Sequence, residues 1–382
     1  MNEFKLVATS GTARAAEFNT LHGRVSTPVF MPVGTQATVK ALSPEEVKAT
    51  GASIILGNAY HLSLQPGVSL ISQFGGLHTF MNWDKPILTD SGGFQAFSLS
   101  QTNKITDDGI TFKSHSDGAL HFIDPKQATL NQIKIGADII MCFDHCIEYG
   151  ASPHEVESAM IRTHKWATIC QETFATSGDR NKQALFGIIQ GGTSRELRLQ
   201  SLDFLSSLDF EGYAIGGLAV GETKSKMYET VSICNQNLPI EKPRYLMGVG
   251  SPEDLIEGVA SGVDMFDCVM PTRVARNGSL YTITGRINIT NQRFKSQDIP
   301  IDPDCNCMLC RNYSTAYLHH LFKAKELLAL RLASIHNLTF MANLMKQIRE
   351  SIVEDKFESF RTIFWAQYQT ANNSKNDSKK NQ

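Results

Sequence analysis

The chain has 382 residues, of which 42% are hydrophobic and 19% are charged, a composition typical of a folded globular protein. Its N-terminal segment is too polar for a signal peptide, and no uninterrupted apolar run approaches the ~18 residues of a membrane span. These features argue against a secreted or a membrane protein. We therefore expect a cytoplasmic protein whose eight cysteines are thiols or metal ligands rather than disulfides.

Charge is distributed unevenly along the chain, although the net charge is only −2. Residues 271–382 contain 16 Lys and Arg against 9 Asp and Glu, a net charge of +7, which leaves −9 for residues 1–270. A basic last third on an acidic body predicts a polyanionic partner that is bound from one side. The alternative is a solvated charge bias without a function.

Short apolar runs that end in Gly, Asn or Asp and give way to a polar loop recur along the chain. The runs are 29–35, 53–58, 86–93, 138–144, 185–192, 212–217, 244–250 and 264–270. They lack a strict alternation of apolar and polar residues, as expected for strands that are buried on both faces. The sequence therefore predicts about eight buried strands.

Helix signals lie between these runs. Ser43, Ser152 and Ser251 each precede a proline and an acid of the first turn, which is a helix N-cap pattern. Residues 124–136 and 193–208 also have helical patterns. Eight strand-then-helix units predict an α/β fold of the (β/α)8 TIM-barrel class, with reactive groups at the C-terminal ends of the strands. A doubly wound open sheet is the alternative.

Two segments fall outside this alternation. Residues 277–336 interrupt the last unit with a hairpin-like stretch and a cysteine cluster, and residues 370–382 are polar and are expected to be disordered. The predicted organisation is a catalytic barrel formed by residues 1–276 and 337–369, with a zinc-binding subdomain inserted near the C-terminus at 277–336.

The inserted segment contains a group of three cysteines spaced C-x-C-x-x-C, namely Cys305, Cys307 and Cys310. His336 follows in a helical run, although His319 and His320 compete with it on spacing alone. Three thiolates and one imidazole would form a closed tetrahedral zinc site, which is structural because no position is left for water. The alternative is a group of three reduced surface thiols.

In a barrel, three aspartates would project from strand ends into one mouth: Asp90, Asp144 and Asp267. Asp267 interrupts an apolar run, where a carboxylate is costly unless it has a partner or a task. Gln190 and the backbone of residues 216–217 would share the mouth. Paired carboxylates suit chemistry at a glycosidic bond. A carboxylate together with a glutamine and a free backbone N–H can also bind the edge of a purine.

Phe94 and Met247 lie near the same strand ends and could sandwich a flat base, although such residues often belong to an ordinary core. Any single aspartate could equally cap a helix or bond to a loop. Three of them together, beside glycines that let a ligand approach the backbone, favour a binding site.

Six motifs carry a more specific signal: TDSGGFQ (89–95), GIIQGG (187–192), GGLAVGE (216–222), YLMGVG (245–250), FDCVMPTR (266–273) and the C-x-C-x-x-C cluster with its later histidine. With these motifs, and over residues 3–365, the chain resembles the bacterial tRNA-guanine transglycosylase (queuine tRNA-ribosyltransferase) family.

The resemblance implies a pentosyltransferase of queuosine biosynthesis. It would exchange the wobble guanine of tRNAs with a GUN anticodon (those for aspartate, asparagine, histidine and tyrosine) for 7-aminomethyl-7-deazaguanine (preQ1). Retention of the β configuration at the ribose is explained by two inversions through a covalent ribosyl-enzyme. The family resemblance further implies a homodimer with one structural Zn2+ per subunit.

The resemblance also implies roles for individual residues. Asp267 would be the nucleophile, and Asp90 the general acid/base that protonates the departing guanine and deprotonates the incoming base. The base-binding residues would be Asp144, Gln190, Gly217, Leu218, Phe94, Met247, Tyr245, Cys146 and Val220. Arg273 and Arg276 would contact the anticodon-loop backbone, whose phosphates carry no sequence information. The zinc ligands would be Cys305, Cys307, Cys310 and His336.

One residue departs from the family pattern. The family commonly has Glu after the aspartate of the fourth strand, whereas the run CFDHC (142–146) has His145 here. This substitution changes a charge beside the purine site, so the choice between preQ1 and queuine stays open. Cys146 and Val220 match the pattern of preQ1 users.

Other functions are compatible with parts of this pattern. The same chemistry could salvage queuine directly. A non-catalytic tRNA-binding accessory subunit would share the barrel and the zinc site, but the presence of both Asp90 and Asp267 argues against it. An archaeal relative that modifies the tRNA D-loop carries further C-terminal RNA-binding domains. A small-molecule glycosidase would bind its substrate independently of salt.

Overall fold

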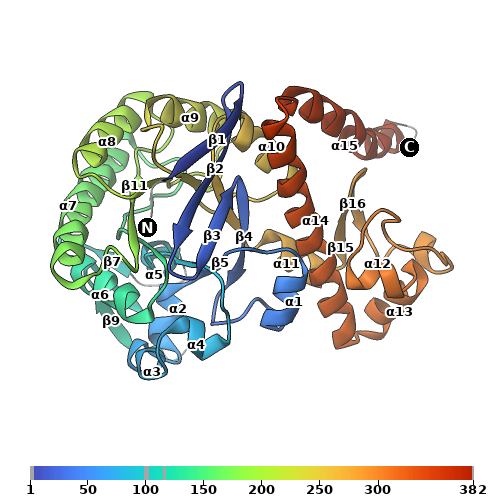
Figure 1. Cartoon of the computed structure of the whole chain (residues 1–382), viewed down its shortest axis with the longest axis horizontal. Helices are drawn as coiled ribbons and strands as arrows, with labels where there is room; N and C mark the ends of the chain where they lie inside the picture. Colours follow the sequence, from blue (N-terminus) through green and yellow to red (C-terminus); the bar gives the residue numbers. More distant parts are fainter. Residues whose placement is uncertain (1–3, 99–102, 115–117, 381–382) are drawn as a thin grey trace.

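A computed structural model describes residues 4–98, 103–114 and 118–380. Eight parallel strands form a closed barrel in the order β10-β11-β12-β13-β14-β4-β5-β6 (Figure 1). They are β4 (Val29–Gly34), β5 (Ile55–Gly57), β6 (Ile87–Thr89), β10 (Ile139–Met141), β11 (Ala184–Ile189), β12 (Gly212–Ile215), β13 (Arg244–Leu246) and β14 (Met265–Cys268). Each predicted apolar run coincides with one of these strands, apart from the first residue of β11, Ala184, which lies just outside its run. The predicted (β/α)8 barrel is therefore confirmed, and the open sheet is excluded.

Helices surround the barrel: α1 (Pro44–Ala49), α2 (Ala59–Leu64), α3 (Val68–Gln73), α4 (Leu77–Met81), α5 (Gly93–Ser98), α6 (Pro125–Ile135), α7 (Pro153–Ser177), α8 (Arg195–Ser207), α9 (Lys224–Asn237), α10 (Pro252–Ala260) and α11 (Met270–Arg276). The three predicted N-caps are confirmed: Ser43, Ser152 and Ser251 each accept a hydrogen bond from the backbone N–H three residues ahead. The helices predicted within 124–136 and 193–208 are α6 and α8.

An antiparallel sheet of β1 (Lys5–Ser10), β2 (Ala13–Thr20) and β3 (Gly23–Thr27) was not predicted. Its buried residues, including Phe18, form one core cluster with residues inside the barrel such as Met31. The sheet lies in front of the barrel in Figure 1. It covers the N-terminal end of the barrel, because its β2–β3 turn contacts the residue that precedes β10.

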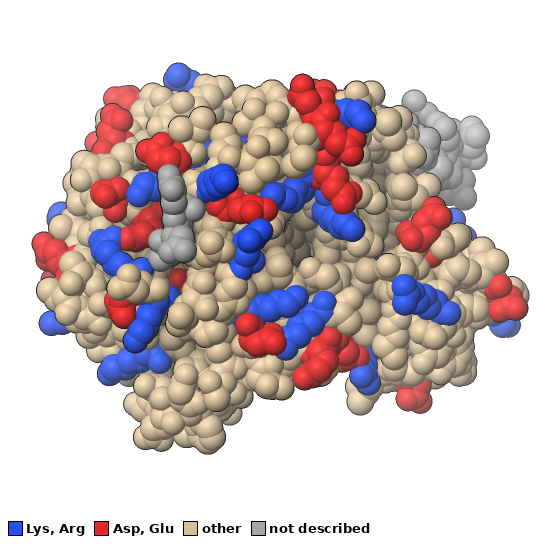
Figure 2. Space-filling view, in the orientation of Figure 1, with Lys and Arg blue, Asp and Glu red and all other residues tan. Residues whose placement is uncertain are grey.

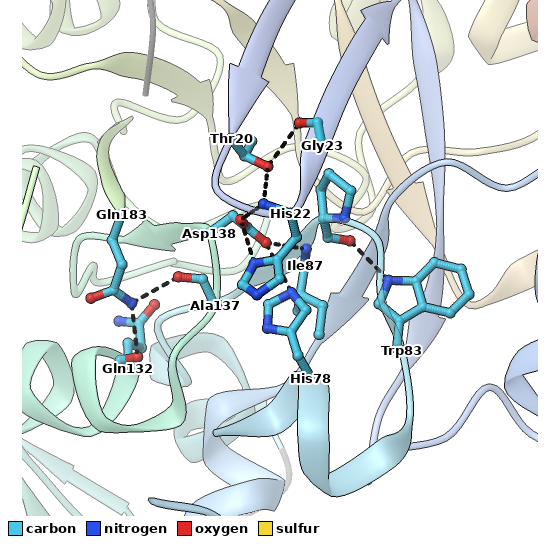
Figure 3. Close-up of polar contacts among 11 residues, drawn as sticks. Thr20, His22, Gly23, His78, Trp83, Ile87, Gln132, Ala137, Asp138 and Gln183 are labelled. Carbon is cyan, nitrogen blue, oxygen red and sulfur yellow. Dashed lines mark hydrogen bonds and ion pairs between the residues drawn. The ribbon is translucent and has the colours of Figure 1, made fainter. Parts of the chain in front are cut away.

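That residue is Asp138, which joins the sheet to two other elements (Figure 3). Its carboxylate accepts hydrogen bonds from the backbone N–H of His22 at 3.1 Å and from His22 Nδ1 at 2.9 Å. It also accepts from His78 Nε2 of α4 at 3.0 Å and from the backbone N–H of Ile87 of β6 at 2.9 Å. The two imidazoles stack with centroids 3.5 Å apart. Asp138 therefore fastens the sheet to the barrel.

Replacing Asp138 by asparagine is expected to lower the free energy of unfolding by about 2–4 kcal/mol at pH 7, because a buried charge with four donors is lost. Burial raises the pKa of Asp138, but hydrogen bonds from His78, Ile87 and His22 outweigh it, so the folded pKa is below its usual value. The stabilisation is therefore present above about pH 4 and is lost as the pH falls further. Denaturant unfolding of both proteins at pH 7 and at pH 3.5 measures this. If the difference in unfolding free energy between the two proteins is the same at pH 3.5 as at pH 7, the stabilising role of the ionised Asp138 is contradicted.

Two smaller sheets and the C-terminal elements complete the described chain. β7 (Asn103–Ile105), β8 (Ile110–Lys113) and β9 (Leu120–Ile123) form one sheet. The predicted hairpin is confirmed as β15 (Ser279–Thr282) and β16 (Gly285–Asn288). The remaining elements are the 3-10 helix η1 (Gln292–Phe294) and the helices α12 (Met308–Asn312), α13 (Thr315–Ala324), α14 (Leu327–Val353) and α15 (Phe357–Lys380).

Helix α14 joins the inserted segment to the barrel. It contacts β4 and α11 of the barrel and also α12, α13 and β15 of the insertion, which lies at the side of the barrel in Figure 1. The helix thus runs through the predicted boundary between residues 336 and 337, and the division into domains stays a prediction. In this structure α15 is helical as far as Lys380, so it includes most of the predicted tail, and the disorder of that tail in solution also stays a prediction.

Surface charge and helix length bear on the predicted partner and location. On the face shown in Figure 2, which carries the N-terminal sheet, the described Lys and Arg side chains are interspersed with Asp and Glu. This face therefore presents a mixed surface to a polyanion. Within the part of the chain that the structure describes, no helix is both long enough and apolar enough to cross a membrane.

Candidate active site

A cavity of about 400 Å³ opens at the C-terminal ends of the barrel strands, within the range of ~300–1,000 Å³ that is usual for small-molecule sites. Eleven of the residues predicted for the site line it: Asp90, Phe94, Asp144, Cys146, Gly217, Leu218, Val220, Tyr245, Met247, Asp267 and Arg273. They come from five strand ends and the loops that follow them. The barrel thus brings together residues that lie far apart in the sequence.

Asp267 lies on β14 and lines the cavity, and the residue as a whole is 9% exposed. One oxygen, Oδ1, accepts hydrogen bonds from Tyr245 Oη at 2.6 Å and from the backbone N–H of Gly248 at 2.7 Å. Burial raises the pKa of Asp267, and these two donors oppose that rise. They hold Oδ1 in place, while Oδ2 makes no hydrogen bond among the described residues.

Asp90 follows β6, and it is held by more donors. Its carboxylate accepts from Asn58 Nδ2 at 2.5 Å, from the backbone N–H of Ala59 at 2.9 Å and from Gln95 Nε2 at 2.8 Å. Burial raises the pKa of Asp90 to about 7, against these hydrogen bonds and with help from the charge of Asp267. A carboxyl group with such a pKa can both give and take a proton near neutral pH.

Asp144 follows β10 and is 5% exposed. Its two oxygens accept separately, Oδ1 from Ser91 Oγ at 3.1 Å and Oδ2 from Gln190 Nε2 at 2.8 Å. Burial raises the pKa of Asp144 to about 6 although both donors oppose the rise, so it is mostly ionised at pH 7. A fixed anion in the cavity wall suits the N–H donors of a guanine-type base.

The loop after β12 forms another part of the wall. Gly217 has a positive φ of +65, and a Cβ at this position would collide with Gln190 Oε1. Both the backbone conformation and the close approach of Gln190 therefore require a glycine at residue 217. Glu222 accepts from the backbone N–H groups of Ala219 at 2.5 Å and Val220 at 3.1 Å, which closes the loop on itself. The loop thereby presents the backbone of Gly217 and Leu218 to the cavity.

Two predicted residues do not line the cavity. Gln190 is 1% exposed and lies behind Gly217, from where it reaches Asp144. Arg276 is half-buried on α11, one turn beyond Arg273, which is exposed at the cavity. The Nη1 atom of Arg276 is buried and has no hydrogen-bond partner among the described residues.

His145, the residue that departs from the family pattern, points toward α7 and is not among the residues that line the cavity. Its Nδ1 lies 3.0 Å from Arg162 Nη1. Burial and the charge of Arg162 lower the pKa of His145 to about 4, so the ring is neutral at pH 7 and accepts from Arg162. Its effect on the base is therefore indirect.

The cysteine cluster is assembled as predicted, with His336 rather than His319 or His320 as its fourth member. The Sγ atoms of Cys305, Cys307 and Cys310 lie 3.7, 3.6 and 3.4 Å from His336 Nδ1. Ligands of a tetrahedral zinc ion, with bonds of ~2.3 Å to sulfur and ~2.0 Å to nitrogen, are about 3.6 Å apart. His336 Nε2 donates to the Tyr281 carbonyl at 2.8 Å, which leaves Nδ1 as the ligand atom. The donor set and its spacing therefore fit zinc.

Replacing Cys307 by alanine is expected to reduce bound metal from about one ion per chain to ~0.1 or less and to lower the melting temperature, because metal binding is coupled to folding. Elemental analysis and thermal unfolding measure the two effects. Cys234→Ala is the matched control, since this buried thiol of α9 is not part of the cluster. Unchanged metal content in the Cys307 variant would show that the cluster does not hold the ion.

Several residues of the site were not predicted from the sequence. Asn58, Gln95 and Ser91 hold the aspartates, and Gly248 donates to the nucleophile candidate. Gln95 and Ser91 belong to the TDSGGFQ motif, and Asn58 ends an apolar run, so the strand-end rule that identified the aspartates could have found them. Arg198 of α8, whose guanidinium donates to the backbone carbonyls of Ile189 and Gly216, carries no such signal.

Comparisons with known proteins agree with this architecture. Residues 9–370 match the family model described as queuine tRNA-ribosyltransferase. A queuine tRNA-ribosyltransferase of Dehalococcoides mccartyi is 54% identical over 360 residues, which cover 94% of this chain and 91% of that protein. Proteins of the same name from Herpetosiphon aurantiacus and Caldanaerobacter subterraneus subsp. tengcongensis are 53% and 54% identical, over 97% and 93% of this chain and 94% of each protein.

Proposed function

Because this chain belongs to the queuine tRNA-ribosyltransferase family, we propose that it exchanges the wobble guanine of GUN-anticodon tRNAs for preQ1 by double displacement. The observation that carries this proposal is the pair of buried carboxylates, Asp267 and Asp90, at one cavity with different partners. Burial raises the pKa of both groups, that of Asp90 to about 7, and a carboxyl group with this pKa can exchange a proton near neutral pH.

In the first displacement, Oδ2 of Asp267 attacks C1′ of the ribose, and the bond from C1′ to guanine N9 breaks. Tyr245 and Gly248 fix the other oxygen, which orients the attacking one. Asp90 gives its proton to the departing guanine, whose ring takes up the electron pair of the broken bond. The result is a ribosyl ester of Asp267 with the tRNA strand intact.

In the second displacement, N9 of the incoming base attacks C1′ and releases the Asp267 carboxylate. Asp90 takes the proton of that nitrogen, which restores the starting protonation state. Two inversions retain the β configuration. The reaction uses no outside oxidant or reductant.

The cavity wall supports a guanine-type base. Asp144, held from behind by Gln190, would bind the N–H-rich edge of the purine. The backbone of Gly217 and Leu218 would bind its carbonyl oxygen and the aminomethyl group. Phe94 and Met247 line the same cavity and would stack on the ring. A wobble base lies in a single-stranded loop, so it can leave the stack at low cost.

The preference for preQ1 rests on Cys146 and Val220, which line the cavity. Direct salvage of queuine is the second candidate. Mass spectrometry of tRNA nucleosides after incubation with an equimolar mixture of the two bases tests the choice, and we expect at least ~10-fold more preQ1. Product formed equally from a tRNA with an altered wobble base would contradict the proposed site of exchange.

Arg273 and Arg276 would bind the phosphates of the anticodon loop. Replacing both arginines by glutamine is expected to weaken tRNA binding by about 10–100-fold in 50 mM salt and to lower the slope of log affinity against log salt by about 1–2. Filter binding at several salt concentrations measures this. Replacement of Arg24, exposed at the opposite end of the barrel, is the control. A slope that is unchanged in the double variant would exclude these contacts.

The zinc ion would be structural. Cys305, Cys307, Cys310 and His336 would hold it and so fasten the insertion to α14, and it would supply no reactive group. We also propose that the enzyme is cytoplasmic and acts as a homodimer. Light scattering of the purified protein near its working concentration tests the dimer.

A further inference from the structure

A buried arginine lies behind the cavity, and the charge of Glu222 acts on it only from beyond ion-pair distance. Arg198 of α8 is 0% exposed. Its guanidinium donates to three backbone carbonyls, from Nε to Gly192 at 2.8 Å, from Nη1 to Ile189 at 2.7 Å and from Nη2 to Gly216 at 2.8 Å. Within the described ranges, no carboxylate lies at ion-pair distance from it. A charge taken out of water in this way is costly, and a purely structural tie needs no charge.

Two of the three carbonyls belong to the strand ends that build the purine wall, and the third belongs to the loop after β11. Ile189 ends β11 immediately before Gln190, and Gly216 follows β12 immediately before Gly217. The backbone N–H of Gly216 also donates to the Ile189 carbonyl at 3.1 Å. The guanidinium therefore sets the spacing between the two strand ends, and with it the spacing between the Gln190 amide and the Gly217 backbone.

This spacing has little slack. A Cβ on Gly216 would lie 2.7 Å from Gln190 Nε2, and one on Gly217 would lie 3.7 Å from Arg198 Nη2. The order in space from the cavity wall to α8 is therefore Asp144, Gln190, Gly217 and the guanidinium of Arg198. A shift of the guanidinium would move the Ile189 and Gly216 carbonyls to which it is bonded, and these residues directly precede Gln190 and Gly217.

The charge of Arg198 also extends to the cavity wall. Burial and the charge of Asp144 raise the pKa of the Cys146 thiol, which lines the cavity, and the charge of Arg198 opposes that rise only in part. A guanidinium stays protonated in a protein, so the positive charge is permanent. It partly balances the carboxylate of Asp144 in the same wall, from a position behind the strand ends.

We propose that Arg198 is a positioning residue for the purine, which fixes the two strand ends that carry Gln190 and Gly217. The inference rests on the proposed function and deepens it. Arg198 itself does not touch the substrate, since it does not line the cavity. Its loss should weaken the binding of the base more than it changes the reactivity of Asp267.

Arg198→Met in the full-length, zinc-loaded protein tests this proposal. We expect both the Kd for guanine, measured by calorimetry, and the KM for guanine to rise about 10–100-fold, because binding groups displaced by ~1 Å lose affinity of this order. The kcat should stay within about threefold of the wild-type value. Guanidinium chloride at a non-denaturing concentration should restore binding by refilling the space. Arg198→Lys keeps the charge but cannot reach all three carbonyls, so a smaller rise is expected, and this variant decides the question if the methionine variant does not fold.

Arg14→Met is the matched control. Arg14 is 3% exposed and also donates to two carbonyls, but it is paired with Asp264 at the N-terminal end of the barrel. Its loss should lower stability, leave the Kd for guanine unchanged and show no rescue by guanidinium. A wild-type Kd in both Arg198 variants, or a rise of the same size in the Arg14 variant, would overturn the positioning role. Absence of guanine binding and exchange in the wild-type protein would instead overturn the proposed function, and the positioning role with it.

Discussion

Replacing Asp267 by asparagine is expected to abolish base exchange, with a loss of about 10⁴-fold or more, and to abolish the denaturation-resistant adduct between protein and tRNA. The amide oxygen of the new side chain can still accept the hydrogen bonds from Tyr245 and Gly248, both of which go to Oδ1 in the wild-type protein. The fold and the cavity should therefore persist. Gel electrophoresis under denaturing conditions, together with exchange of labelled guanine, measures the effect.

Tyr245→Phe is the matched control for this experiment. It keeps the carboxylate and removes one hydrogen bond of 2.6 Å, so the adduct should still form, with exchange reduced by about tenfold. Adduct of wild-type yield from the Asp267 variant would mean that another group attacks the ribose, and the assignment of the nucleophile would be wrong.

Replacing Asp90 by asparagine is expected to reduce exchange by about 10³-fold, within the usual range for the loss of a general acid/base. Burial and the Asp267 charge raise the pKa of Asp90 to about 7, so the wild-type carboxyl is protonated below this pH and ionised above it. Guanine release, which needs the proton, should slow as the pH rises through about 7. Capture of the incoming base, which needs the ionised form, should accelerate over the same interval.

Single-turnover measurements of the two half-reactions between pH 5.5 and 8.5 test this division of labour. The Asp90 variant should lose both pH dependences, because the group that titrates near 7 is gone. Equal pH profiles for the two half-reactions in the wild-type protein would show that Asp90 does not serve both. A variant that keeps the wild-type profile at reduced rate would place the titrating group elsewhere.

The barrel could be predicted from the sequence because its strands follow one local rule. Each short apolar run ends in a turn residue, and strands that are buried on both faces need no alternation. The same rule placed Asp90, Asp144 and Asp267 at one end, since parallel strands in a closed barrel all point the same way. Ser43, Ser152 and Ser251 identified helix starts by their caps, which are also local.

What could not be predicted depends on contacts between distant segments. The N-terminal sheet is defined by its packing across the barrel end, and by Asp138 meeting His22 from 116 residues away. The backbone carbonyls of Ile189 and Gly216 accept hydrogen bonds from Arg198, which in the sequence looks like any other arginine of a helix. The residues next to His22 and Arg198 in the sequence do not distinguish these two side chains from a solvent-exposed histidine or arginine. The fourth ligand of the cysteine cluster was open for the same reason until α14 placed His336 against it.

The most direct test of the double displacement is a reaction with no incoming base. The wild-type protein is mixed with an unmodified GUN-anticodon tRNA, and released guanine and denaturation-resistant adduct are measured together. Our account predicts a single burst of guanine, up to one per chain, with an equal amount of adduct that disappears when preQ1 is added and yields preQ1-containing tRNA. Continuous guanine release without adduct, or no release until preQ1 is present, would contradict the account.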